Sequence, residues 1–224
     1  TVLVYCSAGF TVILGRWILH ERLTWIKIVA VILSLGGTVL VAEAYEPSMW
    51  NTNLSGILTG VLSGLSYAIY SLMGRTASNK GVSPWTTLLY SFGFAGVFLL
   101  LFNLIPGDFF IGKAVVASDL LWLGTRWDGW IILILLAAIP TLGGFGFYNV
   151  SLSYLPSSIA NLITTTEPAF TAVSAYLILS ERLTPIQIIG SIITLSGVLF
   201  LRLFENYNRL KKNDLEPVKP QEEF

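Results

Sequence analysis

Cysteine, histidine and charged residues are all scarce in this chain. Its 224 residues include a single cysteine, Cys6, and a single histidine, His20. They therefore support neither a disulfide framework nor a cluster of metal ligands. Charged residues make up only 12% of the sequence, which is half of the roughly 25% typical of a soluble domain. The 13 basic residues are balanced by 13 acidic ones, so the chain has no excess of positive charge for binding nucleic acid.

Apolar residues take the place of the missing charge. They account for 54% of the chain, and the mean hydropathy is +0.72. Runs of about 20 apolar residues recur along the sequence, which is the length of helix needed to cross a bilayer. The pattern predicts an all-α polytopic bundle of about seven transmembrane helices in the cell membrane. The predicted spans are 2–19, 25–44, 54–73, 85–105, 130–150, 155–179 and 185–203.

The segments between the spans predict how the chain is threaded through the membrane. Most connectors are short, so neighbouring helices should run antiparallel. The longer connector 106–129 has a pattern too irregular to assign, and the charged tail 205–224 is predicted to be solvated and largely disordered. Lysine and arginine concentrate in the first and third connectors and in the tail, on one face of an alternating topology. Positive residues favour the cytoplasmic side, so the C-terminus is expected in the cytoplasm.

Two segments that lie 160 residues apart indicate an internal repeat. The tetrapeptide Glu-Arg-Leu-Thr at 21–24 recurs at 181–184, and flanking apolar residues match as well, including Gly37 with Gly197. An odd number of predicted spans, five, separates the two copies. The copies should therefore lie on opposite sides of the membrane, as inverted-topology repeats do. Such repeats are typical of secondary transporters, whose substrate site lies near the midplane between the two halves.

At these residues the sequence resembles the EamA-type members of the drug/metabolite transporter superfamily. In that family each five-helix repeat carries a Pro-aromatic element in its fourth helix, then a Glu-Arg-Leu motif, then a fifth helix containing glycine. The second copy here matches throughout, with Glu-Pro-Ala-Phe at 167–170, Leu-Ser-Glu-Arg-Leu-Thr at 179–184, and Gly190 with Gly197. The first copy has Ser-Ala-Gly-Phe at 7–10, so neither the acid nor the proline is duplicated.

The resemblance implies a division of the chain. Residues 1–45 would be the last two helices of a first repeat, 54–203 a complete second repeat, and 205–224 the C-terminal tail. By analogy with the family, three helices of the first repeat would precede this sequence. The fold it implies is a bundle of inverted five-helix repeats with the first repeat incomplete.

Glu167 is the strongest candidate for a functional residue because it is an acid in the middle of a predicted span. An ionised carboxylate in hydrocarbon is costly unless it finds a partner or takes up a proton. At helical spacing it shares one face with Thr164, Thr171 and Ser174, which predicts a polar stripe that faces a cavity. The functional interpretation is a site that takes up a proton or binds an amine-bearing substrate. The structural interpretation is a glutamate that hydrogen-bonds neighbouring helices beside a bend at Pro168.

Four more polar residues are predicted to line the cavity and to orient a substrate by hydrogen bonds. They are Tyr67, Tyr70, Tyr148 and Asn149. Anchoring at the membrane interface explains tyrosines near span ends equally well. No catalytic residue, metal site or cofactor is predicted, and the sequence has no glycine-rich phosphate loop.

The charged motif itself is interpreted as structural. Glu21 with Arg22, and Glu181 with Arg182, are expected to form local ion pairs at opposite interfaces and to mark the topology. His20 is interpreted as a solvated connector residue.

Together these features predict a secondary transporter, not an enzyme, that exports small metabolites or drugs by alternating access of its repeats. Its expected partners are a small-molecule substrate and the lipid bilayer, with protons as a candidate coupling ion and no nucleic acid. Two alternatives stay open. One is an inactive fragment or membrane scaffold, and the other is an intramembrane lipid-modifying enzyme, which would need histidine, aspartate or paired acids near a membrane face.

Overall fold

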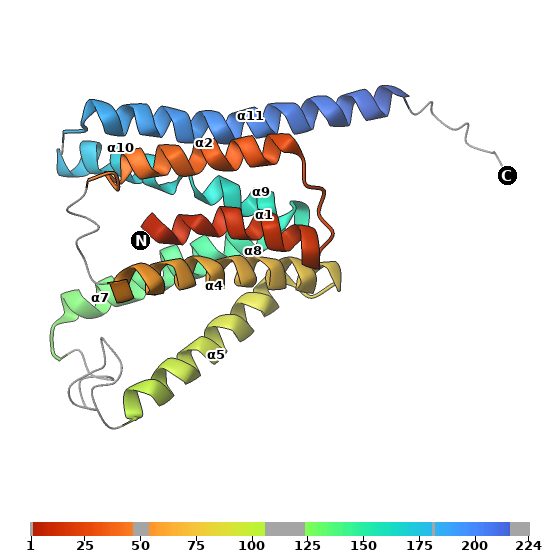
Figure 1. Ribbon diagram of the computed structural model, residues 1–224. Helices are drawn as coiled ribbons and strands as arrows, with labels where there is room; N and C mark the ends of the chain where they lie inside the picture. Colours follow the sequence, from red (N-terminus) through yellow and green to blue (C-terminus); the bar gives the residue numbers. More distant parts are fainter. Residues whose placement is uncertain (1, 47–53, 106–123, 181, 216–224) are drawn as a thin grey trace. The chain divides into compact units, whose positions relative to one another are not determined.

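The computed structural model describes residues 2–46, 54–105, 124–180 and 182–215. All regular structure in these ranges is helical, and Figure 1 shows the order of the helices. The elements are η1 (Val2–Cys6), α1 (Ser7–Ile18), α2 (Trp25–Val41), α4 (Leu54–Asn79), α5 (Pro84–Leu104), α7 (Trp127–Leu136), η2 (Ala137–Phe145), α8 (Gly146–Tyr154), α9 (Ser157–Thr164), α10 (Glu167–Leu179) and α11 (Pro185–Leu215).

The prediction of an all-α polytopic bundle is confirmed, since each predicted span coincides with described helix. Five helical segments are long and apolar enough to cross a membrane, and two shorter ones are apolar. The long segments are Leu54–Asn79, Pro84–Leu104, Trp127–Tyr154, Ser157–Leu179 and Pro185–Phe204, and the shorter ones are Leu3–Ile18 and Trp25–Val41.

The C-terminal tail is more ordered than the sequence indicated. Helix α11 continues to Leu215, so the expectation of a disordered chain from residue 205 onward is wrong up to that point. Extending an existing helix costs little compared with starting one, and the added segment contains glutamate, arginine, leucine and lysine, which favour helix. The rest of the tail, 216–224, and most of the long connector, 106–123, lie outside the described residues.

The chain divides into two compact units. The first consists of Thr1–Leu72 with Pro156–Phe224, and the second is Met73–Leu155. Helix α4 contributes residues to both.

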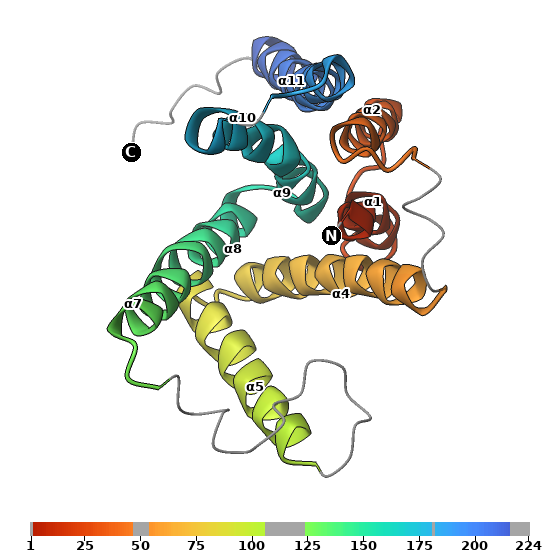
Figure 2. The ribbon, with the colours of Figure 1, turned by 90° about the vertical axis from the view of Figure 1, so that its left-hand side faces the viewer.

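In the first unit, α2 and α11 lie side by side along their length (Figures 1 and 2). A Cβ atom added to Gly190 on α11 would lie 2.7 Å from Leu40 Cβ, and one added to Gly197 would lie 3.1 Å from the Ala30 carbonyl oxygen. Advancing along α11 therefore means moving back along α2, so the two helices are antiparallel. The absence of side chains at these glycines lets the two backbones approach closely, as small residues do between membrane helices.

The contacts between α2 and α11 come in matched pairs. In each match, the residues of one pair are equivalent, at an offset of 160 positions, to the residues of the other. A Cβ on Gly37 would meet Thr194, and a Cβ on Gly197 would meet Ser34. Gly197 is the repeat equivalent of Gly37, and Thr194 is the equivalent of Ser34. The Thr194 hydroxyl also donates to the Ser34 carbonyl at 3.5 Å. Gly37 thus contacts Thr194, and their equivalents in the other copy, Gly197 and Ser34, contact each other. A two-fold axis between the two copies generates pairs of contacts of this kind.

The connectors that carry the repeated tetrapeptide share their backbone geometry. His20 and Ser180, at equivalent positions, end their helices with positive φ angles of 55° and 57°. Each following threonine caps the next helix. Its hydroxyl accepts a hydrogen bond from the backbone N–H three residues later, at 3.4 Å for Thr24 and 3.2 Å for Thr184. The resemblance between the two copies therefore extends from sequence to backbone conformation.

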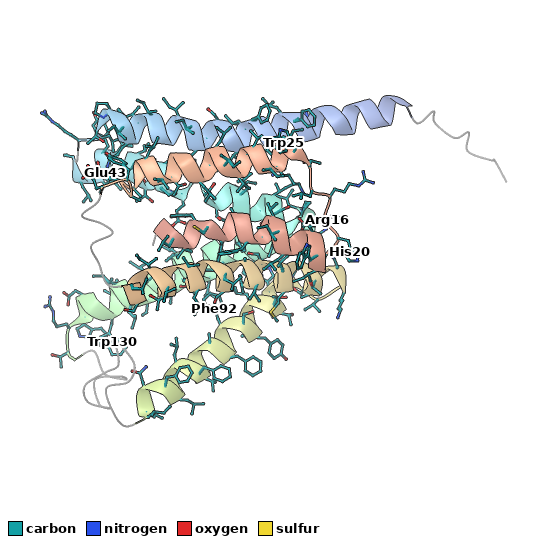
Figure 3. All side chains as sticks on the ribbon, in the orientation of Figure 1. Arg16, His20, Trp25, Glu43, Phe92 and Trp130 are labelled. Atoms are coloured by element: carbon teal, nitrogen blue, oxygen red, sulfur yellow. The ribbon has the colours of Figure 1, made fainter. Side chains whose placement is uncertain are left out.

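The two connectors lie at opposite ends of α2. Thr24 caps the start of this helix, whereas the Thr184 hydroxyl lies 3.5 Å from a carboxylate oxygen of Glu43, just beyond its end. Figure 3 shows Trp25 and Glu43 at the two ends. At 1.5 Å per residue, the 17-residue helix separates them by about 25 Å.

The second unit packs α5 against α8, with the end of α4 beside them. A Cβ on Gly146 would lie 2.5 Å from the nearest atom of the Trp85 ring, and Phe92 meets Phe145 edge to face at 5.0 Å between centroids. Figure 3 labels Phe92 on α5. Between α7 and α8 the helix widens to a π-helix around Pro140, which loosens this span where the sequence places a proline and a pair of glycines.

The α2–α11 packing predicts opposite effects for two adjacent glycines. A Cβ at Gly37 would lie 2.6 Å from the Gly190 carbonyl oxygen, whereas a Cβ at Gly36 meets nothing within 4 Å. Gly37→Ala is therefore expected to lower the free energy of unfolding in detergent micelles by about 1–3 kcal/mol. Gly36→Ala should leave it unchanged or raise it by up to about 1 kcal/mol through helix propensity. Equal stability of the two variants would contradict the close packing.

The placement of the repeated connectors predicts labelling from opposite sides of the membrane. Arg22 and Arg182 are equivalent, exposed residues, and Cys6 is the chain's single cysteine. In a Cys6→Ala background, Arg22→Cys and Arg182→Cys are expected to react with a membrane-impermeant thiol reagent from opposite sides of sealed vesicles. Reaction of both from the same side would rule out the inverted arrangement.

Candidate functional site

The helix that carries Glu167 is broken immediately before it. Helix α9 ends at Thr164, and α10 begins at Glu167. The two residues between them form tight turns, because the N–H groups of Thr165 and Thr166 each donate three residues back at 3.1 Å. Pro168 follows as the second residue of α10, where its missing N–H costs nothing. The bend predicted from this proline is thus present, as a break between two helices.

The first copy changes its helical form at the same register. Element η1 is a 3-10 helix that ends at Cys6, and α1 begins at Ser7. Ser7 is the repeat equivalent of Glu167. The first copy lacks the Glu-Pro pair, but its helix also changes geometry at this position, from a 3-10 helix to an α-helix.

Glu167 lies near a tyrosine from another element of the first unit. Its side chain is exposed, and its carboxylate is close enough to the Tyr5 phenol on η1 for the two groups to interact electrostatically. Tyr67 on α4 is close enough to interact electrostatically with the same phenol. Glu167 occupies the first turn of α10, where the helix dipole favours a negative charge. An accessible carboxylate thus lies near a phenol group, which in turn interacts with a second phenol on α4.

Tyr67 and Tyr70 are both predicted as cavity residues, and the structure places Tyr67 close enough to Tyr5 to interact with its phenol electrostatically. Both side chains are half-buried on α4, and their rings stack with centroids 6.3 Å apart. Tyr5 itself was not identified from the sequence. Its position near residue 1 gives no local signal, because its approach to Glu167 brings together residues that are 162 positions apart in the sequence.

The helix break interrupts the predicted polar stripe. Thr164 belongs to α9, and its hydroxyl donates to the Asn161 carbonyl at 2.7 Å. Thr171 and Ser174 lie on α10 with Glu167 and are exposed, and the Ser174 hydroxyl donates to the Phe170 carbonyl at 2.9 Å. The predicted common face assumed a continuous helix, so only the part from residue 167 onward keeps its spacing.

Tyr148 and Asn149 are packed inside the second unit. They are 9% and 2% exposed, and the Asn149 amide donates to the Phe145 carbonyl at 2.8 Å. A Cβ on Gly74 would lie 3.3 Å from the Asn149 side-chain oxygen. Asn149 thus packs α8 against the end of α4.

A buried polar chain that the sequence analysis missed joins three helices of the first unit. The Ser7 hydroxyl on α1 donates to the Asn161 side-chain oxygen on α9 at 2.9 Å, and the Asn161 amide donates to the Ser71 hydroxyl on α4 at 3.2 Å. All three side chains are at most 2% exposed. An asparagine within an apolar span was the available signal, since a buried amide in a membrane needs partners from neighbouring helices.

Glu21 does not pair with Arg22 as expected. Arg22 is exposed, and the Glu21 carboxylate turns instead to the beginning of α9 and to Lys27. This group of charged and hydroxyl side chains is described further below.

A model of the EamA-like transporter family matches residues 54–203, which is well over half of the 224-residue chain. The chain belongs to this family. The apolar helices of this EamA-like protein agree with a multi-pass membrane protein, and the motifs at 167–170 and 179–184 predicted the family.

Individual relatives of the EamA-like chain are also named as transporters. Over 198 residues it is 27% identical to an uncharacterized transporter of Archaeoglobus fulgidus, covering 88% of this chain and 64% of the relative. It is 21% identical to a "Probable amino-acid metabolite efflux pump" of Salmonella typhimurium, covering 91% and 66%. It is 31% identical over 152 residues to the threonine/homoserine exporter RhtA of Escherichia coli K12, covering 65% and 45%. The chain spans between 59% and 66% of the first relatives it matches.

Proposed function

We propose that the chain forms part of the solute pathway of a secondary transporter that exports small amine-bearing metabolites by alternating access. Glu167 is the residue at which the substrate amine, or a coupling proton, is bound. The observation that carries this proposal is the exposed carboxylate of Glu167 at a helix break, close enough to Tyr5 to interact with its phenol electrostatically.

The chemistry of this cluster suits a primary amine. A carboxylate accepts charge-assisted hydrogen bonds from an ammonium group, and these are about twice as strong as neutral ones. The faces of tyrosine rings attract cations within about 6 Å. The polar stripe that continues along α10 offers Thr171 as a further hydrogen-bonding group for the same substrate.

The names of the relatives agree with this substrate class. The Salmonella relative is named for efflux of amino-acid metabolites, and the Escherichia coli relative for export of threonine and homoserine. Both classes of molecule carry an amine. A carboxylate that binds an ammonium group also binds a proton, which supports protons as the coupling ion.

Two features support movement by alternating access. The reciprocal packing of α2 and α11 gives the two copies a shared pivot, and both copies have a discontinuity at the register of Glu167. A break in the helix lets its two halves change direction with a small adjustment of the backbone. In this transporter the repeated helices move, and the substrate binds at the break between α9 and α10.

Flux measurements in proteoliposomes test the role of Glu167. Glu167→Gln keeps the shape of the side chain and removes its charge, and it is expected to reduce amine-driven flux about tenfold to a hundredfold, because hydrogen bonds to charged groups contribute about 1.5–3 kcal/mol. Tyr5→Phe removes only a hydroxyl partner and should have a smaller effect in the same direction. Thr59→Ala, an exposed position on α4 outside this stripe whose hydroxyl bonds only within its own helix, serves as the control and should transport normally.

The same assay distinguishes transport from an inert fragment or scaffold. Because the chain covers only part of its relatives' length, flux is measured both in the 224-residue chain and in a version extended by three N-terminal helices. Undiminished flux in Glu167→Gln would remove this residue from the mechanism. Absence of flux in both forms would refute the transport proposal.

A further inference from the structure

One end of the first unit is held together by a buried group of polar side chains. Glu21 lies in the connector between α1 and α2, and Lys27 lies in the first turn of α2. Ser157 and Ser158 are the first two residues of α9. These four residues are called the Glu21–Lys27 latch below. Figure 3 labels His20 and Trp25, which flank its connector.

The carboxylate of Glu21 is the centre of the latch. One of its oxygens accepts hydrogen bonds from the Ser157 backbone N–H at 2.7 Å and from the Ser157 hydroxyl at 2.6 Å. The other oxygen accepts from the backbone N–H and the hydroxyl of Ser158. The Lys27 ammonium donates to the Ser158 hydroxyl at 3.1 Å and lies 4.0 Å from the carboxylate. The group therefore ties α9 to both α1 and α2.

Burial distinguishes this ion pair from the other one in the described part of the chain. The side chains of Lys27 and Glu21 are 8% and 12% exposed, whereas those of Arg126 and Asp128 are 80% and 59% exposed. Removing charges from water is costly, and apolar residues of similar size would usually stabilise a bundle equally well. Packing alone therefore does not account for the choice of a glutamate and a lysine here.

The second copy of the repeat lacks the cation. Gln187 stands where the first copy has Lys27, and its side-chain oxygen accepts the Thr184 N–H at 2.9 Å. Together with the hydrogen bond from Gln187 N–H to the Thr184 hydroxyl, this closes a capping box within its own helix. A lysine in a first turn is opposed by the helix dipole, so Lys27 needs the Glu21 carboxylate. The two ends of the repeated pair thus differ in sequence, with a lysine at position 27 and a glutamine at the equivalent position 187.

We propose that the Glu21–Lys27 latch is the closed gate at its end of the solute pathway, and that it separates each time this end opens. The proposal rests on the proposed transport function and adds to it a location for the gate. Helix α9 is the first half of the broken helix that carries Glu167. Opening therefore consists of releasing the start of α9 from Glu21 while the break at 165–166 takes up the change in direction.

Thiol labelling detects this opening without any measurement of transport. Ala160 on α9 is 2% exposed, so a cysteine there reacts only when α9 moves away. In a Cys6→Ala, Ala160→Cys background, Glu21→Gln and Lys27→Met are each expected to accelerate reaction with an impermeant thiol reagent at least about tenfold. The acceleration should occur only from the side on which Arg22→Cys reacts. Arg22→Gln, one residue away and exposed, should leave the rate unchanged.

Each outcome of the labelling experiment decides the proposal. Unchanged rates in both charge variants would overturn it, and so would equal acceleration from both sides of the membrane, which indicates general loosening of the bundle. If a charge variant fails to fold, Ser157→Ala removes a single hydroxyl donor. It is expected to raise the rate about two- to fivefold, and no change would equally overturn the proposal.

A cross-link connects the latch to transport. Glu21→Cys with Ser157→Cys, joined by a short reducible bifunctional thiol reagent, is expected to stop flux, and reduction should restore it. Full flux in the cross-linked protein would overturn the gate. If flux is absent from the unsubstituted protein in both its 224-residue and its extended form, the transport proposal fails, whereas the labelling experiment still decides whether the latch opens.

Discussion

The close contact between the backbones of α2 and α11 is the constraint on which the rest of the first unit depends. In lipid, apolar side chains gain little from meeting one another, so helix association relies on tight packing and on hydrogen bonds. Gly37, Gly190 and Gly197 provide that packing because they leave room for the opposite helix. The antiparallel, reciprocal contact also fixes which residues of the two copies are equivalent in space. It places one repeated connector at each end of α2.

The polar side chains of the first unit fall into two groups, those that are buried and hydrogen-bonded and those that are exposed. Asn161 is completely buried and spans the distance between Ser7 and Ser71, which fixes α1, α9 and α4 together. Glu167, one and a half turns farther along the chain, is exposed beside Tyr5. Non-helical backbone at membrane depth is tolerated only where it is buried in protein or lines an aqueous cavity. The short break at 165–166 meets the first condition, with Thr165 fully buried and Thr166 8% exposed.

Local features of the sequence predicted the fold well. Apolar runs gave the spans, the tetrapeptide at 21–24 and 181–184 gave the repeat, and Pro168 gave the bend. These signals are local because helix length, helix ends and proline geometry depend on a few neighbouring residues. The tail was misjudged because its polar composition suggested disorder, although its residues also continue an existing helix to Leu215.

The candidate site was predictable only in part because its contacts join distant segments. Glu167 was identifiable as an acid in a span, but its partner Tyr5 is set by the packing of η1. Lys27 looked like an interfacial charge, and Glu21 looked like a partner for Arg22. Their actual pairing requires the start of α9, more than 130 residues away, to lie beside them. The spacing of residues within one helix does not indicate which residues of a distant helix they will contact.

The register shared by Ser7 and Glu167 has a consequence for stoichiometry. Ser7 and Glu167 stand at equivalent positions of the two copies, yet the Ser7 hydroxyl is locked into a buried hydrogen bond, whereas Glu167 is an exposed acid. A serine hydroxyl has no charge with which to neutralise an ammonium group or to store a proton. At this register the two copies therefore offer one acid between them, so a cycle that works as we propose has one carboxylate here for each turnover, and not two.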